Sequence, residues 1–144
     1  MANMEVNGLD GLLDDLEALA GLPDSVGEDI LNAEADVIVS AQREEIGRRW
    51  RGPYSEGISA HAVKKGPVKR KGPGQSISIY PQGTRKRRGN SVRNAEIAFI
   101  NEFGAPGRGI SARPAIAAAN AKAEQAAADA GERVFNAYLD SKTL

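Results

Sequence analysis

Cysteine is absent from this 144-residue sequence, and histidine occurs once, as His61. The absence of cysteine excludes disulfide frameworks, thiolate zinc sites and cysteine nucleophiles. One histidine cannot form a histidine-rich metal site within one chain, and it is the only imidazole that could serve a catalytic triad. We interpret His61 as an ordinary surface or half-buried residue, and adjacent acids such as Glu44 with Glu45 as solvated helix faces. The sequence therefore predicts no catalytic residue, metal site or cofactor, and favours a protein that is not an enzyme.

Aromatic residues are also few, with one tryptophan, three tyrosines and three phenylalanines. Apolar residues make up 41% of the chain, and many of them are alanine, so we expect one domain with a thin core. The first residues have no basic region followed by a long apolar core, and no apolar run approaches the roughly 18 residues of a membrane span. We expect a soluble protein that is not exported and has no membrane partner.

Charge is segregated along the chain although the net charge is zero. Residues 1–42 contain ten acids and no lysine or arginine, whereas residues 43–93 contain fourteen bases and three acids. Such a distribution suits either contact with nucleic acid or pairing of the acidic part with the basic part, within one chain or between subunits. We favour pairing because the two blocks nearly cancel.

Apolar periodicity predicts two helices in the acidic part of the chain. Leucines at helical spacing, with acids on the other side, predict an amphipathic helix over residues 8–20 that ends at Gly21 and Pro23. A helix of about six turns then extends to Trp50, with Asp24 or Ser25 as its cap. Its broad apolar face should pack on a sheet or on a second long helix. The leucine stripe of the first helix consists of Leu9, Leu12, Leu13, Leu16 and Leu19. The apolar stripe of the second helix consists of Val26, Ile30, Ala33, Val37 and Ala41, and it is widened by Leu31, Ala35 and Ile38.

Residues 51–94 are rich in glycine, proline and basic residues. In the stretches between them, apolar residues alternate with other residues as they do in half-buried strands. Ile58, Ala60 and Ala62 predict one half-buried strand, and Ile77 with Ile79 predict an antiparallel partner. The basic stretch at about 64–74 is predicted as an extended loop or a flared hairpin tip, and that at 84–93 as a second loop. Their cations could neutralise phosphates, but they lack the interleaved aromatics of a single-strand stacking surface, so contact with an acidic protein surface is the competing hypothesis. The candidate residues are Lys64, Lys65, Lys69, Arg70, Lys71, Arg85, Lys86, Arg87 and Arg88.

Two further helices are predicted in the remainder of the chain. Residues 94–103 favour a short helix with Asn94 as its cap, Gly104 at a positive φ turn after its end, and Phe99 and Phe103 anchored in the core. A flexible glycine-rich gap follows. The closing helix runs from Pro114 to about Asp140, and its stripe is almost wholly small: Ile116, Ala119, Ala123, Ala127, Ala130 and Val134. The predicted fold class is α+β, a small antiparallel sheet packed by two long helices and short helices, with residues 1–22 as an acidic amphipathic helix and residues 23–144 as one domain.

The stretch "NAEIAFINEFGAPGRGISARPAI" resembles the tail-component family of long-tailed double-stranded DNA phages. Its aromatic-x-Asn-Glu-Phe-Gly core, glycine-rich gap and Ala-Arg-Pro at the head of a long helix carry the resemblance. Ala115 stands where the family often has a bulky aromatic, and the Thr-Gly-Xaa-Leu stretch of many members is missing. The residues that match, with the preceding aromatic, are predicted to lie at a subunit or partner interface: Phe99, Asn101, Glu102, Phe103, Gly104, Arg113 and Pro114.

The resemblance implies a structural virion protein without an active site that forms a ring, completing the tail or joining it to the head. It implies a location in the virion tail or neck, and in the host cytoplasm during assembly. The implied partners are further copies of the chain, head-closure or connector proteins, tail-tube proteins and genome DNA passing through the lumen. The residues themselves suggest an ion pair between Glu102 and Arg113 that closes the gap. The alternative function is that of a small nucleic-acid-binding protein with basic loops.

Overall fold

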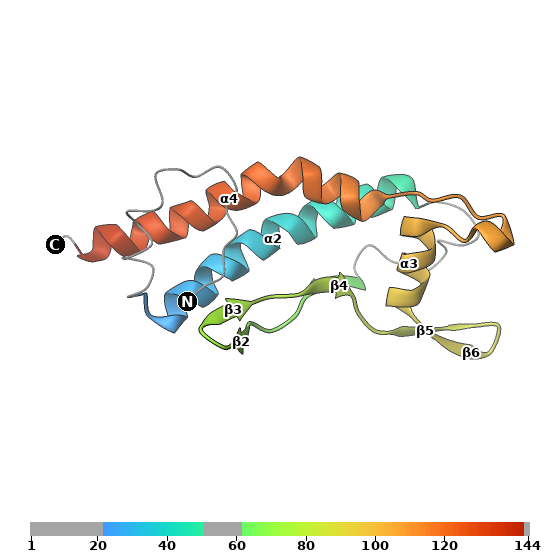
Figure 1. Cartoon of the computed structure of the whole chain (residues 1–144), viewed down its shortest axis with the longest axis horizontal. Helices are drawn as coiled ribbons and strands as arrows, with labels where there is room; N and C mark the ends of the chain where they lie inside the picture. The colour runs from blue at the N-terminus through green and yellow to red at the C-terminus, as the bar shows by residue number, and fades with distance from the viewer. Residues whose placement is uncertain (1–21, 51–61, 143–144) are drawn as a thin grey trace.

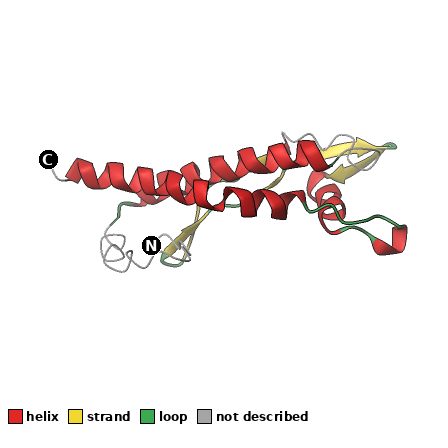
Figure 2. Cartoon of the chain, turned by 90° about the horizontal axis from the view of Figure 1, so that it is seen from above, coloured by secondary structure: helices red, strands yellow, loops and turns green. Residues whose placement is uncertain are grey.

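The computed structural model describes residues 22–50 and 62–142. Its main body is a pair of long antiparallel helices, α2 (Asp24–Arg49) and α4 (Ala115–Lys142), which lie side by side along the longest axis of the molecule (Figures 1 and 2). At 1.5 Å per residue these helices are about 39 and 42 Å long. The helix predicted over residues 8–20 and most of the strand predicted from Ile58 lie outside the described residues. The α+β class and the bounds of both long helices are confirmed.

The first turn of α2 differs from the prediction. Pro23 occupies the N-cap position, and no side chain caps the helix there. Asp24 and Ser25 are helical residues, so their expected role as caps is wrong. The Asp24 carboxylate instead lies 2.6 Å from the Arg70 guanidinium, which belongs to a strand beside this end of the helix.

The buried face of α2 is rotated from the apolar stripe that the sequence suggests. Ala33, Val37 and Ala41 are only half-buried, whereas the polar residues Gln42 and Glu45 are buried. The reason is the position of α4, which supplies partners for both polar side chains: Gln42 donates a hydrogen bond of 2.9 Å to Asn120, and Glu45 lies 3.7 Å from Lys122. The prediction that this helix packs against a second long helix is confirmed, and the buried residues of α2 are Gly27, Ile30, Leu31, Ala35, Val39, Gln42, Glu45 and Ile46.

Small residues form the buried face of α4, as predicted. Ile116 and Val134 are half-buried at the two ends of the stripe, and Phe135 is buried near the C-terminal end. Gly131 lies so close to Glu34 of α2 that a Cβ atom at Gly131 would be 2.3 Å from the Glu34 carboxylate. Alanine and glycine therefore allow the helices to approach closely, and the buried residues are Ala115, Ala119, Ala123, Ala127, Ala130, Gly131 and Phe135.

The described strands form three separate two-stranded antiparallel sheets instead of one small sheet. They lie along one side of α2 and continue past its C-terminal end (Figure 1). Ile77, predicted within a strand, lies between two of them and is half-buried. The pairs are β1 (Val63–Lys65) with β4 (Ile79–Pro81), β2 (Lys69–Lys71) with β3 (Gly74–Ser76), and β5 (Thr84–Arg87) with β6 (Asn90–Arg93).

Both basic segments are hairpins. For residues 64–74 the hairpin alternative is confirmed, because β2 and β3 pair across Gly72. For residues 84–93 the predicted loop is wrong, since β5 and β6 pair in register from Thr84 with Arg93 to Arg87 with Asn90. Arg88 and Gly89 connect them with φ values of 52° and 82°, the two positive φ angles of a type I′ hairpin turn. The Arg-Gly turn lacks the Asn-Gly or Asp-Gly signature, which is why the sequence pattern does not reveal it.

The short helix α3 (Asn94–Phe103) is confirmed, but two details of it are wrong. Asn94 is its first helical residue, and its amide donates to the Gln82 carbonyl at 2.8 Å instead of capping the helix. Phe99 and Phe103 are 63% and 64% exposed, so they do not anchor the helix in the core. The buried face of α3 contains Ile97, Ala98, Asn101 and Glu102, and at 3.6 residues per turn the two phenylalanines fall on the opposite side.

The core consists of two clusters joined by the alanine contacts between α2 and α4. The smaller cluster contains Ile30 and Phe135, where the start of α2 meets the end of α4. The larger cluster lies where the C-terminal end of α2, β1, α3 and the start of α4 meet. It contains Val39, Ile46, Trp50, Val63, Ile97, Ala98 and Ala115.

Candidate functional site: the joint between α3 and α4

Gly104 forms a sharp corner directly after α3. Its φ of 76° and ψ of 178° belong to a backbone region that is almost restricted to glycine, and its N–H donates to the Ile100 carbonyl at 2.8 Å. A Cβ atom at this position would lie 2.7 Å from the Ala112 nitrogen and 2.8 Å from the Ile110 oxygen. The prediction of a positive φ at Gly104 is confirmed, and the close backbone contact gives a second reason for glycine here.

The glycine-rich gap after this corner is a closed loop. Ala105 and Ile110 exchange two backbone hydrogen bonds, of 2.9 and 3.1 Å, across the short 3₁₀ helix η3 (Pro106–Arg108). Gly109 follows in the left-handed helical region with a φ of 69°. The interpretation of this gap as a flexible linker is therefore replaced by a loop that returns the chain beside the end of α3.

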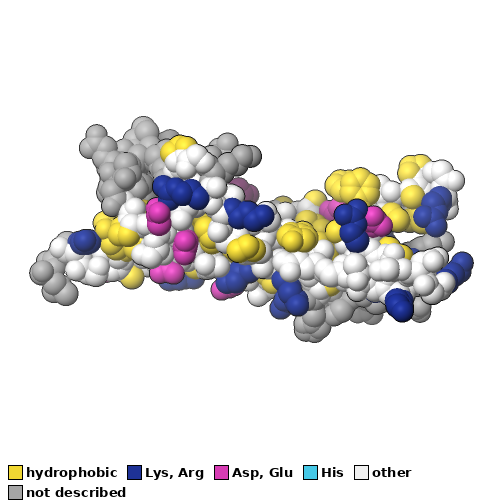
Figure 3. Space-filling view, turned by 90° about the horizontal axis from the view of Figure 1, so that it is seen from below, with side chains coloured by type: hydrophobic (Ala, Val, Ile, Leu, Met, Phe, Trp, Pro, Cys, Tyr) yellow, Lys and Arg dark blue, Asp and Glu magenta, His cyan; other side chains and the backbone are white. Residues whose placement is uncertain are grey.

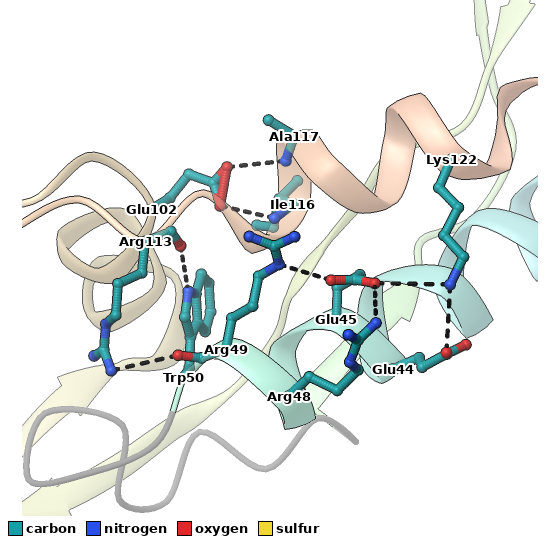
Figure 4. A network of polar contacts seen from close by, with 10 residues as sticks. All are labelled: Glu44, Glu45, Arg48, Arg49, Trp50, Glu102, Arg113, Ile116, Ala117 and Lys122. Atoms are coloured by element: carbon teal, nitrogen blue, oxygen red, sulfur yellow. Dashed lines mark hydrogen bonds and ion pairs between the residues drawn. The ribbon is translucent and has the colours of Figure 1, made fainter.

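Glu102 joins the end of α3 to the beginning of α4. It is 6% exposed, and its two carboxylate oxygens accept hydrogen bonds from the backbone N–H groups of Ile116 and Ala117, at 2.7 and 2.9 Å (Figure 4). These two N–H groups lie in the first turn of α4, where the helix itself supplies no acceptors and where its dipole is positive. A carboxylate from one helix therefore caps another helix, and this fixes the position of α3 relative to α4.

Arg113 contributes both its backbone and its side chain to the same joint. Its N–H donates to the Asn101 carbonyl at 2.8 Å, and its carbonyl accepts a bond of 2.7 Å from the indole N–H of Trp50 (Figure 4). Its guanidinium lies against the Asn101 side chain and 3.5 Å from the Arg49 carbonyl at the end of α2. Pro114 follows, exposed, directly before the first residue of α4.

These contacts change the hypothesis of an ion pair between Glu102 and Arg113. The structure gives the two side chains other partners, namely the first turn of α4 for Glu102, and Asn101 with the end of α2 for Arg113. Asn101 is fully buried, and its amide donates to the Ile97 carbonyl at 2.9 Å. Asn101 and Glu102 thus lie close to Arg113 and Pro114, as predicted. Their contacts connect α2, α3 and α4, but the Glu102 carboxylate and the Arg113 guanidinium do not pair with each other.

A second polar cluster, which was not predicted from the sequence, lies beside the joint, where the C-terminal part of α2 packs against α4. Glu45 is bound by Arg49 at 2.7 Å and Arg48 at 3.1 Å, and Lys122 of α4 bridges Glu45 and Glu44 at 3.7 and 3.4 Å (Figure 4). The hydrogen bond from Arg49, with the charges of the neighbouring cations, lowers the pKa of Glu45 below 4.5. The interpretation of Glu45 as part of a solvated helix face is wrong, because its side chain is 4% exposed. The spacing of Glu45 from Arg48 and Arg49 is the signal that could have revealed the cluster.

Phe99 and Phe103 form an exposed aromatic pair on the outer face of α3. Their ring centroids are 4.8 Å apart and the rings are tilted by 49°. In the described part of the chain, Tyr80 is the one other large hydrophobic residue that is exposed. The view from below shows apolar side chains at the surface over this end of the molecule, next to both acids and bases (Figure 3).

The predicted basic residues separate into two groups. The first lies along α2, where Lys65 pairs with Asp36 at 2.8 Å and Arg70 pairs with Asp24 at 2.6 Å; Lys64 and Lys69 of the same strands are exposed, and Lys71 ends β2. The hydrogen bond from Arg70 lowers the pKa of Asp24 below 3.8. These two pairs confirm that part of the charge segregation is resolved within one chain.

The second group is on the β5–β6 hairpin at the opposite end of the molecule, beside α3 (Figure 1). Lys86 and Arg88 are exposed, whereas Arg85 and Arg87 are half-buried on the face that also carries Val92. Because the two hairpins are at opposite ends of α2, the structure does not form one continuous basic surface from the nine predicted cations.

Among the described residues, no group of three or more histidine, cysteine, aspartate or glutamate side chains is placed to hold a metal ion. None of the described helices combines the length and the apolar character that crossing a membrane requires. The joint thus offers buried hydrogen bonds that fix a geometry, with apolar and cationic surfaces beside it. Comparisons with protein-family models, with curated proteins and with solved structures found no match.

Proposed function

We propose that this protein is a structural component of a phage virion, without enzymatic activity, which assembles as a ring that completes the tail or joins it to the head. The resemblance of residues 94–116 to the tail-component family motivates the proposal. The observation that carries it is the position of Phe99 and Phe103, which are exposed on a helix whose orientation is fixed by buried contacts.

Exposed aromatic pairs of this kind are typical of binding surfaces. Aromatic rings are enriched at the centres of protein interfaces, where they supply much of the binding energy. In the part of the chain that the structure describes, these two rings lie outside the core, although the sequence has only three phenylalanines. A ring also requires a constant angle between neighbouring subunits. Glu102, Gly104 and Arg113 support such an angle because they hold α3 rigidly against α2 and α4.

The experiment is a mass measurement of the full chain by native mass spectrometry, with negative-stain electron microscopy, alone and with purified tail tubes. We expect closed rings of one stoichiometry. The double variant F99S/F103S should keep its helical circular dichroism and lose the rings, whereas the control Y80S, which changes another exposed aromatic, should keep them. A chain that forms no closed assembly, alone or on tail tubes, would contradict the proposal.

Nucleic-acid binding is the second candidate, and the β5–β6 hairpin favours it. Residues 84–93 contain five bases and no acid, and the turn projects from one end of the molecule (Figure 1). In a ring such a hairpin could face DNA in the lumen. A gel-shift titration with short duplex DNA at increasing salt separates the two functions. Tight binding by the monomer that weakens with salt and is lost in K86E/R88E supports the second candidate.

A further inference from the structure

We infer that the exposed Phe99 and Phe103 surface is the docking site for the acidic N-terminal segment, residues 8–20, of a second copy of this chain. The inference deepens the proposed function and rests on it for the closure of the ring. It names the contact that joins neighbouring subunits.

The receptor surface combines an apolar strip with a cationic surround. Glu96, Phe99 and Phe103 succeed one another at positions i, i+3 and i+7, so they share one face of α3. Glu96 is already neutralised by Arg93, whose guanidinium lies 2.8 Å from its carboxylate. The β5–β6 hairpin leads directly into α3 and carries four more bases besides Arg93, and no acid. Acidic groups that approach the two phenylalanines therefore meet a region of net positive charge.

The N-terminal segment has the complementary pattern. Residues 1–22 contain five acids and no base. The five leucines of the predicted helix recur at the spacing by which amphipathic helices bind apolar surfaces, and Asp10, Asp14 and Glu17 recur at helical spacing along one flank of that stripe. A leucine face bordered by carboxylates matches an aromatic face bordered by cations in both respects.

The distances along α2 favour docking of the N-terminal segment on a second copy over docking within its own chain. The segment precedes α2, whereas α3 packs against Ile46 and Trp50 at the other end of that helix. Ile46 is about 35 Å along α2 from Pro23, at 1.5 Å per residue. A helix over residues 8–20 is about 20 Å long, and the two residues that follow it before Pro23 span at most about 7 Å. A segment that is helical over residues 8–20, as predicted, is therefore too short to reach the phenylalanines of its own chain.

The start of α2, to which the donor segment is attached, and the receptor on α3 thus lie at opposite ends of the long helix pair (Figures 1 and 2). A contact between different surfaces of successive copies is heterologous, and such contacts generate closed rings when the rotation between copies closes. The acidic donor and the basic receptor would also account for the charge segregation that the pairs along α2 leave unexplained.

The first test measures binding of a fluorescently labelled peptide of residues 1–22 to the full-length variant L12D/L16D, whose own segment cannot compete. We expect saturable binding that weakens as salt increases. The affinity should fall on the order of tenfold or more when F99S/F103S is added to this variant, and stay unchanged with Y80S. A labelled peptide that itself carries L12D/L16D is the matched control and should not bind. Absence of peptide binding, or equal binding to the F99S/F103S receptor, would overturn the inference.

The second test establishes the arrangement between copies by complementation. L12D/L16D keeps the receptor but lacks a working donor, whereas F99S/F103S keeps the donor but lacks a working receptor. Each variant should therefore be monomeric alone. An equimolar mixture should form a heterodimer and nothing larger, because only one working donor and one working receptor are present in each pair. Mass photometry reads all three samples. A mixture that stays monomeric would overturn docking between copies. A segment that binds within its own chain would also give this result, and it would therefore count against the inference as well.

The two proposals can fail separately. Rings that persist in F99S/F103S would refute this contact and leave ring assembly standing. Peptide binding and heterodimers, in a chain that forms open filaments instead of rings, would support the contact and contradict the proposed function.

Discussion

Replacing Gly104 by alanine should destabilise the joint between α3 and α4 far more than the same replacement at Gly109. Both glycines have positive φ, 76° and 69°, and both border the same short loop. Gly109 lies in the left-handed helical region with no atom within 4 Å of an added Cβ. Gly104 lies in the nearly glycine-only region, and its added Cβ would meet two backbone atoms at 2.7 and 2.8 Å. The comparison therefore separates the cost of a left-handed φ, which both positions share, from the added cost at Gly104 of the nearly glycine-only conformation and the close backbone contact.

The expected costs follow from these geometries. An alanine in the left-handed region costs about 1 kcal/mol, so Gly109→Ala should lower the free energy of unfolding by about that amount. At Gly104 the backbone conformation costs about 2 kcal/mol, and the overlap with backbone that cannot rotate away adds about 1–3 kcal/mol. Gly104→Ala should thus cost about 3–5 kcal/mol. For a chain of this size that corresponds to a fall in Tm of about 9–20 °C, against about 3–4 °C for Gly109→Ala.

The assay is urea unfolding followed by two signals. Trp50 is the only tryptophan, is 5% exposed and bonds to Arg113, so its fluorescence reports on the joint. Far-UV circular dichroism reports mainly on α2 and α4. Equal losses of stability in the two variants would refute the argument, because they would show that the loop moves away from an added methyl group at little cost.

Three further predictions concern buried or partly buried carboxylates. Glu102→Gln removes the charge that caps α4 and one of its two acceptors, so unfolding in urea should show a loss of about 2–3 kcal/mol; an unchanged midpoint would contradict the capping role. Burial raises the pKa of Glu34 above 4.5, so its charge opposes folding at neutral pH and this penalty is relieved as the pH falls through its folded-state pKa. Glu34→Gln should therefore raise Tm at pH 7, with a gain that disappears in scans below pH 4.5. The charge of Glu45 has the opposite effect on stability, because the pKa of this carboxyl is lowered in the folded state. Its charge therefore stabilises the fold above pH 4.5, and this contribution is lost as the pH falls through the folded-state pKa. Glu45→Gln should lower Tm at pH 7 and reduce the difference between Tm at pH 7 and at pH 3; an undiminished difference would show that other groups dominate acid unfolding.

Burial divides the residues of the motif into two groups that should act differently in an assembly. Asn101, Glu102 and Gly104 are buried in or packed against their own chain, so they shape the joint and do not themselves present an interface. Phe99 and Phe103 are the members of the set that a neighbouring subunit can reach. Substitutions in the first group should change stability and assembly together, whereas substitutions of the phenylalanines should change assembly alone.

The sequence by itself determined the elements whose signals are local. Apolar spacing, terminal charges and flanking prolines and glycines defined α2, α3 and α4 closely, because helix formation depends on residues within one or two turns. The alanine stripe of α4 indicated its buried face, and Gly104 indicated a positive φ. Only the tertiary structure decided which way the remaining side chains point. In a helix as short as α3, two apolar stripes compete, and contact with Trp50 and Ala115 selects Ile97 with Ala98 and turns the phenylalanines outward. Lys122 reaches Glu45 from a distant part of the chain because α4 packs against α2, and the loop after Gly104 returns the first turn of α4 to Glu102; no local pattern records either proximity.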